Sequence, residues 1–195
     1  MGSNNDISLK ALAKINLGLD VVRRREDGYH EVRMIMQTIH LYDRLDIKRT
    51  KEPGIQIQTN LSFLPVNENN LIYKAAKLLM DEFSITDGVS VKLDKRIPVA
   101  AGMAGGSTDA AAMLIGVNRL FSLGLTKREL MERGVQIGAD VPYCIMRGTA
   151  LAEGIGEALS PLPPMVKCPV LIAKPSISAV SYTHLRAHET VLDLV

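Results

Sequence analysis

The stretch Pro98-Val-Ala-Ala-Gly-Met-Ala-Gly-Gly-Ser-Thr-Asp-Ala-Ala-Ala112 combines three glycines with a run of alanines and leads into an apolar helical pattern. Glycine adopts backbone conformations that other residues avoid and lets the chain approach a ligand closely. A glycine-rich turn before a helix also leaves several backbone N–H groups pointing one way, with the positive end of the helix dipole behind them. Phosphate is the usual anion at such a place. The stretch therefore predicts a phosphate-binding loop; the alternative is a tight turn in which Ser107 or Thr108 caps the helix.

This loop does not match the commoner phosphate-binding patterns. No lysine follows its glycines, which excludes G-x-x-x-x-G-K-[ST], and neither G-x-G-x-x-G nor the set of protein-kinase motifs is present. The loop instead resembles the second motif of the GHMP kinases, which phosphorylate small molecules. Within that superfamily, Gly105-Gly-Ser-Thr-Asp-Ala-Ala111 is most similar to the 4-diphosphocytidyl-2-C-methyl-D-erythritol kinases. Met103 and Ala104 stand where those enzymes more often have leucine and glycine.

The resemblance implies ATP and Mg²⁺ as cofactors. It assigns the polyphosphate of ATP to the loop residues Pro98, Val99, Ala100, Ala101, Gly102, Met103, Ala104, Gly105, Gly106, Ser107 and Thr108. The hydroxyls of Ser107 and Thr108 are expected to reach a phosphate oxygen or the metal, and Ser107 is the candidate Mg²⁺ contact. Mg²⁺ in such sites is held largely by phosphate oxygens.

Two further segments carry the predicted catalytic pair. Ala13-Lys-Ile-Asn-Leu17 resembles the first motif of the family, and Gly138-Ala-Asp-Val-Pro142 resembles the segment with the catalytic aspartate. The resemblance implies that Asp140 takes the proton of the substrate hydroxyl. Lys14 would lie beside it and stabilise the developing negative charge. Without the resemblance, the local sequence favours a surface charge at Lys14 and a turn-forming or capping residue at Asp140.

The segment Asp27-Gly-Tyr-His-Glu31 carries the prediction of the substrate. Asp-Gly marks a turn, and the flanking stretches can pair as a hairpin in which Tyr29 and His30 simply pack on their neighbours. In the kinases that this chain resembles, a Gly-Tyr-His of this kind holds the cytidine of the substrate. A tyrosine ring can stack on a base, and a histidine offers a donor and an acceptor to a pyrimidine edge. The resemblance therefore implies that Tyr29 and His30 bind substrate, with Asn16 as a weaker candidate.

The composition limits the other classes of function. With 47% hydrophobic and 23% charged residues, the chain is typical of a soluble globular protein. A net charge of +2 argues against a nucleic-acid-binding protein, and no apolar run reaches the roughly 18 residues that cross a bilayer. We expect no signal peptide. Cys144 and Cys168 lack metal-ligand spacing, so a reducing cytoplasm is the expected compartment. Oligomeric state is left open.

The expected fold is α+β, a mostly antiparallel sheet backed by helices, with the layout taken partly from the resemblance. Alternating or apolar patterns predict strands at 7–13, 17–23, 32–39, 43–49, 54–59, 89–93, 149–153 and 170–174. Helical patterns follow at 71–83, from the glycine loop to 124, and at 126–138. Asn69 or Asn70 is expected to cap the first helix, and Thr126 to Glu129 has capping-box spacing. The predicted buried face of the first helix consists of Leu71, Ala75, Leu78, Leu79 and Phe83.

Residues 1–160 are predicted to form the N-terminal, ATP-binding domain of a GHMP kinase. Residues 161–179 are expected to begin a second domain that is largely missing, and 180–195 form a tail unlike the family. His184 and His188 have i, i+4 spacing, but without a third ligand nearby the metal interpretation is disfavoured. Three functions remain open: a kinase for the 2-hydroxyl of 4-diphosphocytidyl-2-C-methyl-D-erythritol, a GHMP kinase for another small alcohol, and a nucleotide-binding fragment without catalysis.

Overall fold

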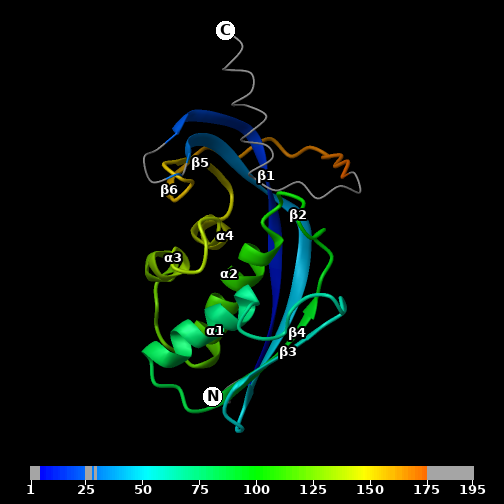
Figure 1. The fold of residues 1–195 in the computed structure, drawn as a ribbon, viewed down its shortest axis with the longest axis vertical. Coiled ribbons are helices and arrows are strands. Elements are labelled where there is room, and N and C mark those ends of the chain that lie inside the picture. Colours follow the sequence, from blue (N-terminus) through cyan, green and yellow to red (C-terminus); the bar gives the residue numbers. More distant parts are fainter. Residues whose placement is uncertain (1–4, 25–27, 29, 175–195) are drawn as a thin grey trace.

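The computed structural model describes residues 5–24, 28 and 30–174, and helices cover one face of a single sheet (Figure 1). The strands are β1 (Asp6–Arg24), β2 (His30–Thr50), β3 (Ile55–Thr59), β4 (Gly88–Asp94), β5 (Thr149–Glu153) and β6 (Ala158–Pro161). The helices are α1 (Leu71–Glu82), α2 (Gly105–Leu120), α3 (Lys127–Gly134) and α4 (Val141–Met146). β3 and β4 pair in parallel, and the other described strand pairs are antiparallel. The predicted α+β class is confirmed.

Strand β2 is the centre of the sheet. One of its edges pairs with β1 from Asp6 opposite Lys48 to Arg24 opposite His30. On its other edge, β4 pairs with residues 44–50 and β5 with residues 34–37. Residues 38–43 of that edge are therefore left between the two partner strands. The glycine loop and α4 approach β2 at this interval.

Strands β1 and β2 are longer than the sequence indicates. The predicted breaks near residues 14 and 40 are irregularities within continuous strands. Between Leu12 opposite Tyr42 and Lys14 opposite Thr38, β2 carries extra residues. Such a bulge bends a strand without ending it, which explains why the alternation of apolar residues is interrupted there.

One prediction at the edge of the sheet needs correction. The predicted strand at 170–174 is wrong: the structure assigns no strand there, and Leu171 is 98% exposed. Instead β6, a strand that the sequence did not predict, pairs with β5. Its proline, Pro161, is the last residue of an edge strand, where a missing N–H is tolerated.

Helix α1 begins as predicted at Asn70, whose side chain accepts a hydrogen bond from the N–H of Ile72 (2.9 Å). Its buried face is rotated from the predicted one, because Leu78 is half-buried and Phe83 follows the helix with 38% exposure. The residues that the helix buries are Ile72, Ala75, Ala76, Leu79 and Met80. The apolar residues at its two ends therefore lie at the margin of the core.

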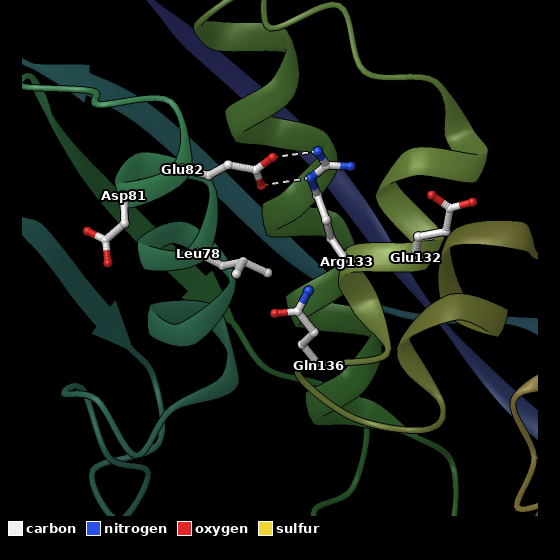
Figure 2. Close-up of a pocket in the computed structure, with 6 residues that line it drawn as sticks. All are labelled: Leu78, Asp81, Glu82, Glu132, Arg133 and Gln136. Carbon is white, nitrogen blue, oxygen red and sulfur yellow. Dashed lines mark hydrogen bonds and ion pairs between the residues drawn. The ribbon is translucent and has the colours of Figure 1, made fainter.

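The capping box that opens α3 is confirmed: Thr126 accepts from the N–H of Glu129, and the Glu129 carboxylate accepts from the N–H of Thr126. The helix ends at Gly134, earlier than predicted. Arg133 near its end donates two hydrogen bonds to the Glu82 carboxylate of α1 across an open groove (Figure 2). This ion pair holds α3 against α1, and the groove is lined by none of the predicted site residues.

Helix α2 is the inner helix and packs on β1 and β2. Its apolar pattern of Ala110, Leu114, Val117 and Phe121 predicts one buried face; the first three are fully buried, whereas Phe121, just past the helix, is half-buried. At Gly116 a Cβ atom would lie 2.3 Å from Cδ1 of Ile47, so the helix backbone rests almost directly on β2. This contact fixes the height of α2 above the sheet and therefore the position of its N-terminus.

Candidate functional site

The loop that joins β4 to α2 has an unusual backbone. Ala100, Gly102 and Ala104 all have positive φ angles, of 53°, 69° and 54°. Two of these are alanines, for which the left-handed region is costly. Such conformations persist where the surrounding structure enforces them, and they are frequent at binding sites. A separate small cluster of buried apolar side chains supports the loop, made of Ala13, Ile39, Ile97 and Met103.

The backbone N–H groups of this loop are not used by the protein itself. Among the described residues, no acceptor contacts the N–H groups of residues 99–107. The first helical bond of α2 is donated by the N–H of Thr108 to the carbonyl of Ala104 (2.8 Å). Ala104 at the N-cap position makes no side-chain cap bond within the described residues. The N-terminus of α2 therefore has unsatisfied donors and the positive end of a 16-residue helix dipole.

Two hydrogen bonds join this loop to β1. The N–H of Lys14 donates to the Met103 carbonyl (3.2 Å), and the hydroxyl of Thr108 donates to the Leu12 carbonyl (2.8 Å). The Thr108 hydroxyl was expected to face a phosphate, but it is buried and occupied by this bond. The Ser107 hydroxyl has no partner among the described residues and is half-buried. Of the two hydroxyls, Ser107 alone is placed to reach a ligand.

The structure brings Lys14 and Asp140 together. Nζ of Lys14 lies 3.9 Å from Oδ2 of Asp140, and the two side chains are 6% and 32% exposed. The same Nζ donates to Oδ1 of Asn16 (3.1 Å). The ammonium is nearly buried and lies next to a carboxylate that still reaches solvent. Its positive charge favours negative charge on groups placed beside it. Residues 126 positions apart in the chain thus share one small volume beside the glycine loop.

The Asp140 side chain does not act as a helix cap. Asp140 precedes the short helix α4, which the sequence did not predict, and its side chain makes no cap hydrogen bond within the described structure. Pro142 in the first turn of α4 helps to start that helix. The capping role considered for Asp140 is therefore not the one observed, and its carboxylate is turned to Lys14.

A ring of three hydrogen bonds holds α4 on β2. The N–H of Gly148 donates to Oγ1 of Thr38 (3.0 Å). The Thr38 hydroxyl donates to the Tyr143 hydroxyl (3.0 Å), and the Tyr143 hydroxyl donates to the Gly148 carbonyl (2.7 Å). Thr38 pairs with Lys14 across the β1–β2 ladder, so the ring lies next to the catalytic candidates. Burial raises the pKa of Tyr143 to about 12, which keeps its hydroxyl a donor. Sequence reasoning missed this ring, because no local pattern links Thr38 to Tyr143.

Cys144 lies in α4 close to the candidate pair but does not fit a nucleophile. Burial, with a smaller contribution from the nearby Asp140 carboxylate, raises the pKa of its thiol to about 12. The thiolate is the reactive form of cysteine. Cys144 is therefore a packing residue of the α4 core.

The predicted substrate residues are separated along the hairpin. His30 is the first residue of β2 and pairs with Arg24, whereas Thr38, further along the strand, pairs with Lys14. Asn16 is in contact with the candidate catalytic pair through the hydrogen bond from Lys14. Tyr29 lies outside the described residues, as do His184 and His188 of the tail.

Comparison with known proteins gives this arrangement a family. The sequence profile of the GHMP kinases N terminal domain matches residues 70–148, which include the glycine loop and Asp140. This segment is a GHMP kinases N terminal domain. The matched GHMP kinase segment lies inside the predicted domain 1–160, whose boundaries stay predictions.

Two relatives within this kinase family are named 4-diphosphocytidyl-2-C-methyl-D-erythritol kinase. The protein of Lachnoclostridium phytofermentans is 60% identical over 186 residues, covering 94% of this chain and 64% of its own length. That of Lachnospira eligens is 63% identical over 172 residues, covering 88% of this chain and 60% of its own length. A solved structure of 4-(cytidine 5'-diphospho)-2C-methyl-D-erythritol kinase superposes with a TM-score of 0.71 at 38% identity, covering 80% of this chain and 55% of that one. The chain thus spans less than two thirds of these relatives.

The donors present in this GHMP kinase domain limit how Mg²⁺ could be held. The described residues contain no group of three or more histidine, cysteine, aspartate or glutamate side chains placed for a metal. They offer the half-buried hydroxyl of Ser107 at the loop. That donor fits a Mg²⁺ held mainly by nucleotide phosphates, which is common for this ion. Within the described range, no helix is long and apolar enough to cross a membrane.

Proposed function

We propose that this domain binds Mg-ATP at the glycine loop and, in the whole protein, transfers the γ-phosphoryl group to the 2-hydroxyl of 4-diphosphocytidyl-2-C-methyl-D-erythritol. The observation that carries the proposal is the meeting of unsatisfied loop amides with the pair Lys14 and Asp140. The amides supply a cradle for polyphosphate, and the pair supplies a proton acceptor with a fixed positive charge. Phosphoryl transfer needs both, because its catalysis is mostly positioning and charge stabilisation.

In this proposal each residue has one task. The loop amides and the α2 dipole bind the polyphosphate, and Ser107 contacts Mg²⁺, which neutralises phosphate charge when bound. The Asp140 carboxylate accepts the proton of the substrate hydroxyl. The Lys14 ammonium keeps that carboxylate oriented and stabilises negative charge as it develops on the transferred group. The Met103 carbonyl, bonded to the Lys14 N–H, sets the distance between cradle and base.

The substrate assignment rests on the relatives and on the hairpin. Proteins 60–63% identical to this chain carry the name of the diphosphocytidyl-methylerythritol kinases. Tyr29 and His30 are the proposed cytidine contacts, and Asn16, beside Lys14, is the proposed contact nearer the reacting hydroxyl. A substrate panel with mevalonate and homoserine beside the cytidine compound tests this choice. Turnover of mevalonate or homoserine in preference to the cytidine compound would overturn it.

The decisive variant for the catalytic role is Asp140→Asn, made in the chain extended with the remaining part of a relative. Loss of the proton acceptor is expected to lower kcat about 100- to 10,000-fold, while the Kd for ATP changes only a few-fold. Coupled ADP release measures the first quantity and calorimetry the second. A parallel loss of ATP affinity would remove Asp140 from the role of base.

A second candidate function is nucleotide binding without catalysis. It is favoured because the chain covers only 60–64% of the length of these two relatives. In this second proposal the chain by itself binds nucleotide without turnover, and the part of the relatives that it does not cover completes the substrate site. A thermal shift with Mg-ATP and ADP release on adding substrate, each with and without the extension, separate the two functions. We further propose a reducing compartment such as the cytoplasm, which the free thiols of Cys144 and Cys168 support.

A further inference from the structure

Beneath the glycine loop lies a buried cluster of three charged side chains that the sequence did not point to. The Lys95 ammonium donates to Oδ2 of Asp43 and to Oδ2 of Asp109 (2.8 Å to the latter). Asp43 belongs to β2, Lys95 follows β4 directly, and Asp109 lies in α2. The three side chains are at most 4% exposed. Burying charged side chains costs free energy. We therefore consider a role for this cluster other than stabilising the fold.

Both ends of the glycine loop are attached to this cluster. At the entrance, Oδ1 of Asp43 accepts hydrogen bonds from the N–H groups of Arg96 and Ile97 (2.5 and 2.8 Å), directly before Pro98. At the exit, Asp109 is one turn beyond Gly105 in α2. The cluster therefore joins the two points between which the loop is suspended.

The close contact at Gly105 shows how tightly the exit is held. A Cβ atom at this position would lie 2.8 Å from Nζ of Lys95 and 3.2 Å from Cγ2 of Ile97. The backbone at the start of α2 thus rests on the Lys95 ammonium. At 4% exposure this ammonium cannot meet a phosphate itself, so any effect on a ligand passes through the backbone.

We infer that Lys95, held by Asp43 and Asp109, is a positioning residue that fixes both ends of the glycine loop and so aims its free amides. This inference rests on the proposed function for what those amides bind. The cluster contacts the backbone at both ends of the loop formed by residues 98–104. A change in the geometry of the cluster therefore changes the direction in which the N–H groups of the loop point. Preorganised donors bind charge strongly since no reorganisation is needed when the ligand arrives.

The two carboxylates are not equivalent. Asp43 uses both oxygens, one for Lys95 and one for two backbone N–H groups. Oδ1 of Asp109 is buried and has no partner among the described residues. An asparagine at 109 can therefore keep an oxygen toward Lys95 and place its NH₂ where no bond is lost. An asparagine at 43 must instead present its NH₂ either to the ammonium or to the backbone donors, and it loses one set of bonds.

This difference gives a matched pair of variants in the full chain, Asp43→Asn and Asp109→Asn. The comparison variant is Leu79→Ala, which removes core packing from α1 away from the loop. Calorimetry with Mg-ADP, well below the melting temperature of each variant, measures the Kd. We expect Asp43→Asn to weaken binding at least about tenfold, as for loss of one charged hydrogen bond. Asp109→Asn, which can keep one oxygen for Lys95, is expected to weaken binding less than Asp43→Asn does, and Leu79→Ala is expected to stay within about threefold of the original Kd.

Amide hydrogen exchange without nucleotide provides the readout that keeps this inference separate from the proposed function. Asp43→Asn should speed exchange of the Thr108 N–H, the first bond of α2, and Leu79→Ala should leave it unchanged. If the unaltered chain binds no nucleotide but this exchange difference is found, the proposed function fails and the positioning role stands. Equal exchange in Asp43→Asn and Leu79→Ala would overturn the positioning role. If Asp43→Asn does not fold, Gly105→Ala, which displaces the Lys95 ammonium, must produce the same faster exchange, and an unchanged rate overturns the inference.

Discussion

Helices α1 and α3 begin in one way and helix α2 in another. Asn70 and Thr126 cap the first two with side-chain oxygens, and each accepts a hydrogen bond from one N–H group of the first helical turn. Helix α2 begins at Ala104 with a left-handed backbone, and its leading N–H groups find no acceptor among the described residues. The capped helices gain stability from their first turn, whereas the donors of α2 are unbonded among the described residues, as the proposed nucleotide site requires. The stabilising bonds of α2 lie beneath the loop, in the cluster of Lys95 with two aspartates.

The largest effect is expected when α2 is given an artificial cap, so that it begins like α1 and α3. Ser107→Asp places a carboxylate among the free amides, where it satisfies them and repels phosphate. We expect Mg-ATP to bind about 30-fold more weakly or worse, with a melting temperature that is unchanged or higher. Calorimetry and thermal unfolding measure the two effects, and Ser107→Ala serves as the uncharged control. Unimpaired binding by the aspartate variant would show that the phosphate lies elsewhere.

Removing a natural helix cap should lower the stability of the fold and leave nucleotide binding unchanged. Thr126→Ala deletes the capping box of α3 and is expected to cost about 1 kcal/mol of unfolding free energy. For a chain of this size that corresponds to a melting temperature lower by roughly 2–4 °C. The Kd for Mg-ATP should not change, because α3 does not contribute to the loop. A change in the Kd would mean that α3 is coupled to the site.

The backbone of the loop itself can be tested at Ala104, where the relatives that the sequence resembles more often have glycine. With φ of 54°, alanine is strained and glycine is not. Ala104→Gly should therefore stabilise the fold by about 0.5 kcal/mol after the entropy of glycine is counted. The control Ala110→Gly, inside the same helix, should destabilise by about 1 kcal/mol or more. Thermal unfolding distinguishes them, and destabilisation by both variants would contradict the left-handed conformation.

The smallest expected effect concerns the bridge between α1 and α3. Arg133 lowers the pKa of Glu82, so the pair stabilises the fold above the ordinary glutamate pKa and loses this effect as the pH falls through the lowered value. Glu82→Gln should cost about 0.5 kcal/mol at pH 7 and less at an acidic pH below the lowered pKa of Glu82. Thermal unfolding of both proteins at the two pH values measures this. A cost independent of pH would show that packing, and not charge, joins the helices.

The sequence was a good guide where a feature is local. The capping box at Thr126, the cap at Asn70 and the strand at 149–153 depend on residues close in the chain, and all three are found. The proximity of Lys14 to Asp140 could not be read from spacing. Family resemblance predicted it, and the structure places the two side chains 3.9 Å apart.

What remained hidden from the sequence depends on tertiary contacts. Helix α4 has six residues, too few to show a period, and it is held by the bonds of Tyr143 to Thr38 and Gly148. Lys95 and Asp43 each look like an ordinary surface charge beside a strand. Only the fold, by stacking α2 on β2, makes them a buried pair.

The central claim is that the free amides at the start of α2 receive the polyphosphate of ATP beside Lys14 and Asp140. Titration of the isotope-labelled chain with a non-hydrolysable Mg-ATP analogue, followed by amide resonances, tests it most directly. The account predicts the largest shifts at residues 99–107, with smaller ones at Lys14 and Asp140. Saturable binding that leaves the loop resonances unmoved and shifts another surface would contradict it.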